Sequence, residues 1–200
     1  IENYTDSLEE LTMLTDAVYI ASLHETHYEY AKYMLNNKKH VLCEKPAVLK
    51  KAQAEELYSI AKENNVVFME AVKTAYCPGF HAMMAAAKSG KIGRIIDVEA
   101  AFSRLTPVNT REYMAQDYNG SFLEFGSYVC MPVFELLGCD YDDVRFHSMR
   151  AVNGVDAYTK AVFSFGGKSA EVKTGLGVKT EGQLLISGTN GYILAKSPWW

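Results

Sequence analysis

The chain has 200 residues and a mass of 22.3 kDa, and 48% of its residues are apolar, which is enough for one large or two small hydrophobic cores. Twenty basic residues nearly balance 24 acidic ones, giving a net charge of -4 without a basic run, which excludes a surface that neutralises nucleic-acid phosphates. No stretch approaches the roughly 18 uninterrupted apolar residues of a membrane span.

The first third of the chain alternates the signals of strands and helices. Residues 15–22 (TDAVYIAS) are short, apolar and β-branched, and residues 23–39 repeat apolar side chains at helical spacing. Ser22 and Glu25 fit the S-x-x-E capping box, in which two side chains bond free N–H groups at the start of a helix. We therefore expect a strand that leads into a helix, with the boundary at Ser22.

Two more strands follow in the same rhythm. Residues 40–44 (HVLCE) and 66–71 (VVFMEA) predict the strands, and residues 50–65 between them predict an amphipathic helix. The order β-α-β-α-β closes with parallel strands through right-handed connections. The continuous apolar runs are typical of a parallel sheet that is covered on both faces.

Polar residues follow the ends of these strands. Because the carboxyl ends of parallel strands meet at one edge, where open α/β sheets bind ligands, we expect four side chains to gather there: Ser22, Glu44, Lys45 and Glu70. Pro46 fixes its own φ near about -65° and disfavours the helical region at Lys45, which holds the ammonium at the exit of the strand. An exposed lysine in a loop is the alternative interpretation.

The pattern changes after residue 72. Residues 78–93 predict a helix closed by glycines, and residues 94–105 predict a strand. Short strand signals separated by Gly and Asn turns, without helices between them, then occur at residues 143–152, 157–166, 168–178, 182–188 and 191–195. This pattern predicts a mostly antiparallel, open sheet.

We therefore expect an α/β domain followed by an α+β domain. Residues 1–73 are predicted to be the C-terminal part of a Rossmann-like parallel domain, and residues 74–200 a substrate and oligomerisation domain. The four cysteines lie far apart without a C-x-x-C pair, which predicts buried, reduced thiols rather than a disulfide framework or a zinc site. Together with a polar, acidic beginning unlike a signal peptide, this predicts a cytoplasmic protein.

Residues 119–138 (NGSFLEFGSYVCMPVFELLG) predict a helix from about Ser121 to Leu137. Glu124 and Tyr128 lie four residues apart on one face, so an acid and a phenol are neighbours there. Pro132 lacks the N–H that would bond the carbonyl of Tyr128, which predicts a kink or a carbonyl open to another donor. A core helix with a tyrosine at its margin explains these residues equally well. The apolar stripe of this helix comprises Phe122, Phe125, Val129, Val133 and Leu136.

Two segments resemble a known family. AVYIASLHETHYEYAKYMLNNKKHVLCEKP is similar to the stretch ending in Glu-Lys-Pro of the glucose-fructose oxidoreductase and inositol dehydrogenase (Gfo/Idh/MocA) family. NGSFLEFGSYVCMPVFELLG resembles that family's helix with Asp, Gly and then His or Tyr, and the tyrosine is similar to the trans-dihydrodiol dehydrogenase-like branch. SGKIGRI and GTNGYILAKSPWW extend the likeness along nearly the whole chain. The resemblance implies hydride transfer between NAD or NADP and a carbon of a sugar, polyol or diol.

The resemblance also implies roles for individual residues. Lys45 would lie near the nicotinamide, Tyr128 would be the general acid or base, and Glu124 would stand at the family's Asp position. A free tyrosine is a poor base at neutral pH because its pKa is about 10, and a nearby cation such as Lys45 favours the ionised phenol. The implied cofactor-binding residues are Ser22, Leu23, His24, His27, Glu44, Lys45 and Pro46.

The chain departs from the family pattern at several positions. Glu124 is one methylene longer than the family's Asp, and Leu23-His24 replaces the family's Pro-Asn, which puts a cofactor ribose contact in doubt. His24 and His27 form an H-x-x-H pair, but two imidazoles at a helix start without a third ligand are far more often structural than metal-binding, so we expect no metal site.

The largest departure is the G-x-G-x-x-G turn that cradles the pyrophosphate, which does not occur in these 200 residues. The chain begins where the family would have completed two strands, and SPWW comes before the family's final segments, so we expect either a fragment of a longer enzyme or a reduced relative. For these residues by themselves we expect weak or no dinucleotide binding.

Two other functions remain open. A chain of this fold without the phosphate site is also explained as a binding or assembly subunit, a homo-oligomer paired through its antiparallel sheet. A regulator that senses a sugar in the same pocket is a third possibility. Candidates for lining that pocket, none of them favoured, are Arg104, Arg111, Tyr113 and Tyr158.

Overall fold

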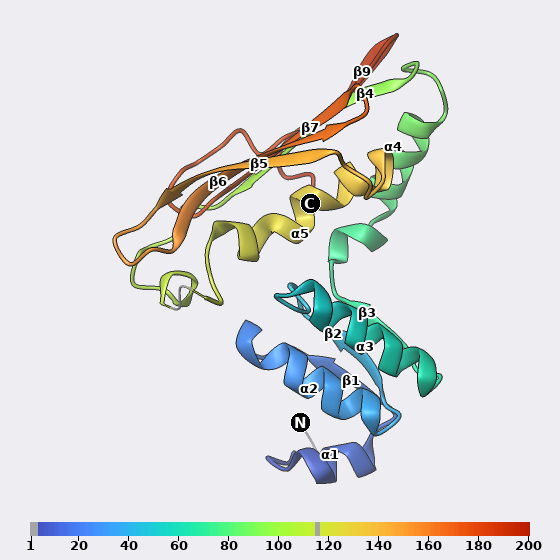
Figure 1. Cartoon of the computed structure of the whole chain (residues 1–200), viewed down its shortest axis with the longest axis vertical. Helices are drawn as coiled ribbons and strands as arrows, with labels where there is room; N and C mark the ends of the chain where they lie inside the picture. Colours follow the sequence, from blue (N-terminus) through green and yellow to red (C-terminus); the bar gives the residue numbers. More distant parts are fainter. Residues whose placement is uncertain (1–3, 115–116) are drawn as a thin grey trace. The chain divides into compact units, whose positions relative to one another are not determined.

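The computed structural model describes residues 4–114 and 117–200, and the chain divides into two compact units (Figure 1). The first unit is Ile1–Ala71 and the second is Val72–Trp200. Each unit has a hydrophobic core of its own.

The first unit is a three-stranded parallel sheet with helices in its connections, as the β-α-β-α-β pattern predicted. The strand order is β1-β2-β3. Its elements in chain order are α1 (Leu8–Leu14), β1 (Ala17–Ile20), α2 (His24–Asn36), β2 (His40–Cys43), α3 (Lys51–Glu63) and β3 (Phe68–Glu70). Helices α2 and α3 lie side by side on the same sheet (Figure 1).

The core of the first unit forms where α2 and α3 meet one sheet face. Met34 and Leu35 of α2, Val41 of β2 and Leu57 of α3 are at most 2% exposed. Full burial of one such side chain contributes about 1.5–3 kcal/mol. The packing of the amphipathic helix faces therefore holds this short sheet together.

The second face of this sheet is different from the expectation. Tyr19, Leu42 and Val67 are 56%, 39% and 48% exposed and border a shallow depression of about 390 Å³. Within the described residues, one face of the sheet is covered by helices and the other is not, so the prediction of a sheet covered on both faces is wrong for this chain.

The predicted capping box at the start of α2 is also wrong. The residue that precedes the helix is Leu23, in an extended conformation, and no side chain caps this helix. The Ser22 hydroxyl lies 2.6 Å from the hydroxyl of Thr26 instead. Because the helix begins at His24, Ser22 is one residue too early to reach the N–H of Glu25.

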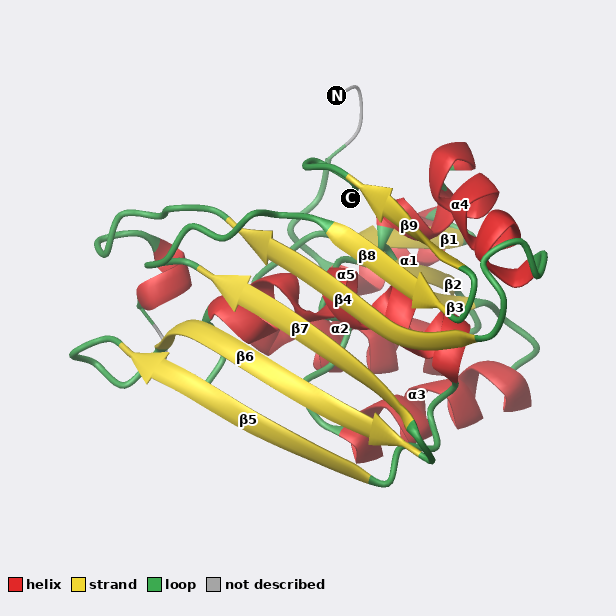
Figure 2. Ribbon diagram, turned by 90° about the horizontal axis from the view of Figure 1, so that it is seen from above, coloured by secondary structure: helices red, strands yellow, loops and turns green. Residues whose placement is uncertain are grey.

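The second unit is built on a six-stranded sheet of order β5-β6-β7-β4-β8-β9 (Figure 2). Only the neighbours β4 and β7 are parallel, so the prediction of a mostly antiparallel sheet is confirmed. Its elements are η1 (Lys73–Tyr76), α4 (Pro78–Lys88), β4 (Ile95–Ser103), η2 (Arg111–Tyr113), α5 (Ser121–Leu137), β5 (Asp143–Arg150), β6 (Asp156–Phe165), β7 (Lys168–Gly175), β8 (Leu184–Gly188) and β9 (Gly191–Ala195).

Helix α5 covers one face of the six-stranded sheet. Its Val129 and Val133 are fully buried against Val98 of β4, Ala161 of β6 and Val172 of β7. The helix runs without a break from Ser121 to Leu137 with Pro132 inside it, and these bounds match the prediction. In Figure 2 no helix lies over the opposite face of the sheet as far as the structure describes the chain.

The cysteines are all free, but they are not all buried as expected. Cys43 is buried, Cys77 and Cys130 are partly buried, and Cys139 is exposed in the segment between α5 and β5. No helix in the described part of the chain is long and apolar enough to span a membrane.

Candidate functional site

The strand ends of the first unit form one aligned edge. Ile20 is in register with Cys43, and Cys43 with Glu70, so the three parallel strands finish level with each other. Glu44 directly follows β2, and Ser22 and Lys45 each lie two residues beyond the end of a strand. The sheet therefore brings the polar residues to one edge, as its topology predicted.

The loop that contains Lys45 is anchored by neighbouring elements. The Tyr19 hydroxyl of β1 donates a short hydrogen bond to Glu44, whose other carboxylate oxygen accepts from the backbone N–H of Lys45 at 3.3 Å. Glu70, the last residue of β3, accepts from the backbone N–H of Ala47 at 3.0 Å. The carboxylates of Glu44 and Glu70 thus fix the backbone on both sides of the Lys45-Pro46 pair.

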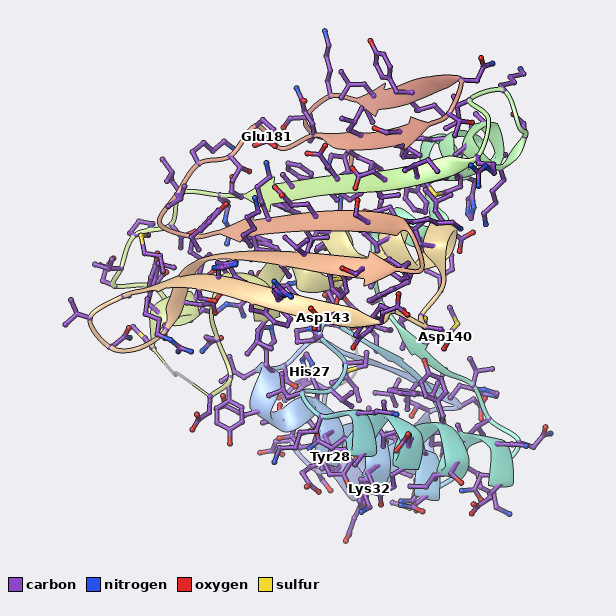
Figure 3. All side chains as sticks on the ribbon, turned by 45° about the horizontal axis from the view of Figure 1, so that its top comes forward. His27, Tyr28, Lys32, Asp140, Asp143 and Glu181 are labelled. Atoms are coloured by element: carbon purple, nitrogen blue, oxygen red, sulfur yellow. The ribbon has the colours of Figure 1, made fainter. Side chains whose placement is uncertain are left out.

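His27 lies on α2 (Figure 3) and is fully buried behind the same loop. Its Nδ1 lies 2.9 Å from the carbonyl oxygen of Pro46, and its Nε2 lies 3.2 Å from the carbonyl oxygen of Ser22. The imidazole ring therefore stands between the backbone that follows β1 and the backbone that follows Lys45.

The residues at the start of α2 form the rest of this edge. Leu23 is 50% exposed and extended, and the His24 ring packs edge-on against the His27 ring at 5.6 Å between centroids. Within residues 4–114 and 117–200, no three His, Cys, Asp or Glu side chains are grouped so that they could hold a metal ion. The exposed Leu23 side chain therefore presents an apolar surface next to the carboxyl ends of the strands.

The thiol at the end of β2 is not poised for chemistry. Burial, together with the negative charges of Glu70 and Glu44, raises the pKa of Cys43 to about 12. A thiol of this kind is protonated at neutral pH and is a poor nucleophile. The chemistry that this edge can provide therefore depends on its charged and hydrogen-bonding groups.

In the second unit, Glu124 and Tyr128 lie one turn apart on α5 and are 8% and 9% exposed. The Tyr128 ring packs at 5.2 Å from the ring of Phe102, the residue before the last in β4. Phe102 in turn stacks on Phe125 at 4.3 Å and on Trp200 at 3.8 Å. Rigid aromatic contacts thus restrict the orientation of the Tyr128 ring.

The start of α5 is held by a residue that the sequence analysis did not single out. Asp156 Oδ2 accepts hydrogen bonds from the Ser121 hydroxyl at 2.6 Å, the Phe122 backbone N–H at 3.0 Å and the Thr159 hydroxyl at 2.8 Å. Gly120, with φ of 132°, precedes the helix, and a Cβ there would lie 1.9 Å from Asp156 Oδ1. The Gly120-Ser121 pair indicates in the sequence where the helix begins. The residue that binds this helix start, Asp156, comes 35 residues after Ser121, so no local pattern reveals it.

Two arginines lie near the same aromatic cluster. Arg104, directly after β4, donates to Glu112 at 2.9 Å, and its guanidinium lies 5.8 Å from the centre of the Phe125 ring. Burial raises the pKa of Glu112, but its hydrogen bonds and the charges of Arg104 and Arg111 outweigh this and hold the pKa below its usual value. Both guanidinium groups remain more than half exposed.

The two tyrosines considered as pocket residues have different positions. Tyr113 is buried at 3% exposure, and burial together with the charge of Asp156 raises its pKa. Tyr158 alternates along β6 with the buried Ala157 and Thr159, so it lies on the sheet face opposite α5 and away from Tyr128.

These features define an architecture: a Rossmann-type parallel sheet followed by a domain with an open, mixed sheet. Residues 1–72 match the family model described as "Oxidoreductase family, NAD-binding Rossmann fold", and residues 80–194 match the "GFO/IDH/MocA C-terminal domain". The chain belongs to the GFO/IDH/MocA oxidoreductase family, as its resemblance indicated.

Curated relatives include dehydrogenases. The chain is 35% identical over 165 residues to scyllo-inositol 2-dehydrogenase (NADP(+)) IolU of Bacillus subtilis, covering 78% of this chain and 49% of the relative. It is 28% identical over 190 residues to trans-1,2-dihydrobenzene-1,2-diol dehydrogenase of Xenopus laevis, covering 92% of this chain and 57% of the relative. The chain thus spans about half the length of the curated relatives it matches.

A solved structure shares the fold. GenD2 from gentamicin A biosynthesis, whose crystal structure is in complex with NAD, superposes with a TM-score of 0.87 at 22% identity, covering 96% of this chain and 58% of that one. The likeness supports the same two-unit architecture.

Proposed function

We propose that this chain is part of an NAD(P)-dependent oxidoreductase that transfers a hydride between the nicotinamide and a hydroxyl or carbonyl carbon of a sugar, polyol or diol. The relatives named for scyllo-inositol and a dihydrodiol support the substrate class. We assign residues 1–73 to the dinucleotide-binding domain and residues 74–200 to the substrate and oligomerisation domain, and we place the protein in the cytoplasm.

The observation that carries this proposal is the anchored loop around Lys45. A catalytic ammonium stabilises developing negative charge best when the surrounding structure fixes its position before the reaction. Glu44, Glu70 and His27 each bind the backbone within two residues of Lys45. A loop with an unconstrained surface lysine would not require three such anchors from separate elements.

Tyr128 is the proposed general acid or base. Its phenolic oxygen would take the proton from a substrate hydroxyl during oxidation and return it during reduction, with Lys45 favouring the phenolate. Help of this kind accelerates a reaction by about 10² to 10⁴-fold. Glu124, one turn before Tyr128 on α5, is proposed to orient the substrate through its carboxylate.

The residues of the first unit fit one side of a dinucleotide site. Helix α2 begins without a side-chain cap, and an uncapped helix start suits an anionic or hydroxyl-bearing group. The half-exposed Leu23 offers an apolar surface for a flat ring. When bound, the nicotinamide accepts or supplies the hydride. The residues proposed to contact or shape this site are Ser22, Leu23, His24, His27, Glu44, Lys45 and Pro46.

Turnover tests the proposal directly. In the protein expressed from its complete reading frame, oxidation of scyllo-inositol and of a trans-diol is measured with NAD⁺ and NADP⁺. We expect Lys45→Met and Tyr128→Phe each to lower kcat by about 10² to 10⁴-fold. The controls are Lys50→Met, an exposed residue just before α3, and Tyr30→Phe, an exposed tyrosine on α2. Activity in both active-site variants equal to that of the controls would contradict the assignment.

A homo-oligomer paired through the six-stranded sheet is part of the proposal. The sheet face opposite α5 carries Leu185, Tyr192 and Leu194, which border a depression of about 500 Å³. Apolar side chains on an open sheet face suit face-to-face pairing of two copies. We expect light scattering to give a dimer or larger species, and Leu194→Lys to shift it toward the monomer.

A non-catalytic assembly subunit or a sugar-sensing regulator are the other candidate functions. Titration of the protein from its complete reading frame with NADH and NADPH separates an enzyme from a scaffold, because an enzyme gives a saturable change in nicotinamide fluorescence and a scaffold gives none. A regulator would bind a sugar without turnover. We expect these 200 residues by themselves to bind dinucleotide weakly or not at all, since they contain no G-x-G-x-x-G motif. Tight binding by these residues would contradict that expectation.

A further inference from the structure

We propose that His27 and Glu70 are positioning residues that clamp one peptide unit, the one between Pro46 and Ala47, and through it hold Lys45 in place. The inference deepens the proposed function and depends on it for the role of Lys45. Neither side chain is assigned to the reaction itself. Their shared target is the peptide bond that begins one residue after Lys45.

The two contacts meet on the two ends of a single peptide group. His27 Nδ1 lies 2.9 Å from the oxygen of Pro46, and Glu70 Oε1 lies 3.0 Å from the nitrogen of Ala47. The carbonyl of Pro46 and the N–H of Ala47 belong to the same planar amide. Hydrogen bonds at both of its polar groups therefore fix the plane and its rotation about the chain axis.

The chemistry of proline makes this clamp effective for Lys45. Proline has a fixed φ and limits the conformations of the residue before it, so few rotations separate the clamped amide from the Cα of Lys45. On the other side, the N–H of Lys45 is held by Glu44 at 3.3 Å. The lysine backbone is thus constrained from both directions.

The burial of His27 supports a dedicated role for its ring. The side chain is fully buried, and burying a polar ring costs free energy unless its nitrogens are hydrogen-bonded. Each ring nitrogen faces a carbonyl oxygen, at Pro46 and at Ser22. A nitrogen donates only when it carries a proton, so the neutral ring makes one of these bonds and the imidazolium ring makes both. The Pro46 contact is the shorter, and we assign the Nδ1 proton to it.

The two clamping residues come from different elements. His27 is in the first turn of α2, whereas Glu70 ends β3, and the clamped amide follows β2. A loop held only for packing needs apolar contacts, which Ala47 already provides at 5% exposure. Hydrogen bonds from two further elements fix the orientation of the loop backbone as well as its position. A lysine ammonium that must point at a reacting atom requires both.

Hydrogen exchange in the 200-residue chain tests the clamp without any assay of activity. We expect His27→Leu, which removes the donor, to speed exchange of the Ala47 amide by at least about tenfold. His27→Asn keeps a donor near the position of Nδ1, so it should restore most of the protection. The Glu44 amide, which bonds to Ile20 at 2.8 Å, reports in each sample whether the sheet is intact.

Tyr28→Phe is the matched control on the same helix. Tyr28 and Lys32 lie together on a side of α2 away from His27, beside Glu56 of α3 (Figure 3). Removing the Tyr28 hydroxyl should leave the exchange rate of the Ala47 amide unchanged. Unchanged exchange of Ala47 in His27→Leu with an intact sheet would overturn the proposal.

Glu70 supplies a second test if His27→Leu fails to fold. Glu70→Gln keeps an oxygen acceptor, whereas Glu70→Met removes it at similar size, so Ala47 should exchange at least about tenfold faster in Glu70→Met than in Glu70→Gln. Equal rates in the two variants would overturn the proposal.

The clamp and the proposed function fail in different ways. In the protein from its complete reading frame, His27→Leu should lower kcat more than it raises KM, and His27→Asn should recover part of the rate. A faster Ala47 exchange with unchanged kcat supports the clamp but contradicts a catalytic Lys45. Unchanged exchange contradicts the clamp whatever the rate.

Discussion

Asp156, the first residue of β6, accepts a hydrogen bond from the backbone N–H of Phe122 at 3.0 Å and so caps a helix that begins 35 residues earlier. The capped helix, α5, carries both Glu124 and Tyr128. A carboxylate at a helix start satisfies free N–H groups and interacts favourably with the helix dipole. The position of the proposed acid-base residue therefore depends on a strand residue far from it in sequence.

Removing this cap should destabilise the second unit. We expect Asp156→Ala to lower the free energy of unfolding by about 1–3 kcal/mol, because two hydroxyls and one N–H lose their shared acceptor. Urea unfolding measures the change. The control is Asp143→Ala. Asp143 is an exposed residue at the start of β5, and its described ion pair is with the exposed Arg145, so the substitution should cost less than about 0.5 kcal/mol of unfolding free energy. Equal losses in the two variants would show that Asp156 is not a cap.

Gly120 is required beside that cap. Its φ of 132° is unfavourable for any other residue, and a Cβ would lie 1.9 Å from the Asp156 carboxylate. We expect Gly120→Ala to cost about 1–3 kcal/mol in unfolding free energy. Gly79→Ala is the matched control, because nothing lies within 4 Å of its added Cβ in the first turn of α4, so it should stabilise by about 0.4–1 kcal/mol. A neutral Gly120→Ala is the outcome that contradicts this account.

The stability of the second unit should depend on Glu112 in acid. Its folded pKa is lowered, so the unfolded chain takes up the proton first, and the stabilisation present at neutral pH is lost as the pH falls below the ordinary glutamate range. Glu112→Gln should therefore destabilise the protein more at pH 7 than at pH 3 in urea unfolding. Glu135→Gln, an exposed partner of Lys88, should change little at either pH. A Glu112→Gln effect of equal size at both values would contradict the charge-based explanation.

Thiol reactivity should separate the cysteines by burial. Burial raises the pKa of Cys43 and of Cys130 to about 12, so their thiolates are scarce at pH 8, whereas Cys139 is exposed. We expect Ellman's reagent to modify Cys139 quickly, and Cys43 and Cys130 only on unfolding. Because the unfolded thiols ionise first, these two groups should also reduce stability as the pH rises from about 9 toward 12. Modification of Cys43 in the folded protein at the rate of Cys139 is the contrary result.

The order of strands and helices was predictable from the sequence because its periodicity is strong. The bounds of α5 agree with the prediction, and the shift from βα units to short strands correctly indicated a mostly antiparallel sheet. Helix α1 was not predicted, although Ser7 and Glu10 form the same S-x-x-E pattern as Ser22 and Glu25. Ser7 does accept from the Glu10 N–H at 3.3 Å. A four-residue pattern does not reveal where the helix begins, and that position decides which serine is the cap.

The neighbours of the site residues were less predictable. The sequence placed Lys45 and Glu70 at one sheet edge, and the family resemblance added His27 and Pro46 as cofactor-binding residues. The bonds that join His27 and Glu70 to a single amide depend on loop geometry. Pairing across loops has no periodicity, so no local pattern encodes it. The family resemblance supplied the roles that local physics left open.

The central claim is that Lys45 and Tyr128 act together on one reacting oxygen, and a double-mutant cycle on kcat tests it most directly. In the protein from its complete reading frame, Lys45→Met and Tyr128→Phe should each reduce kcat by about 10² to 10⁴-fold, and the double variant should be little slower than the slower single variant. Losses that multiply in the double variant would show that the two residues act independently and would contradict the proposed joint action.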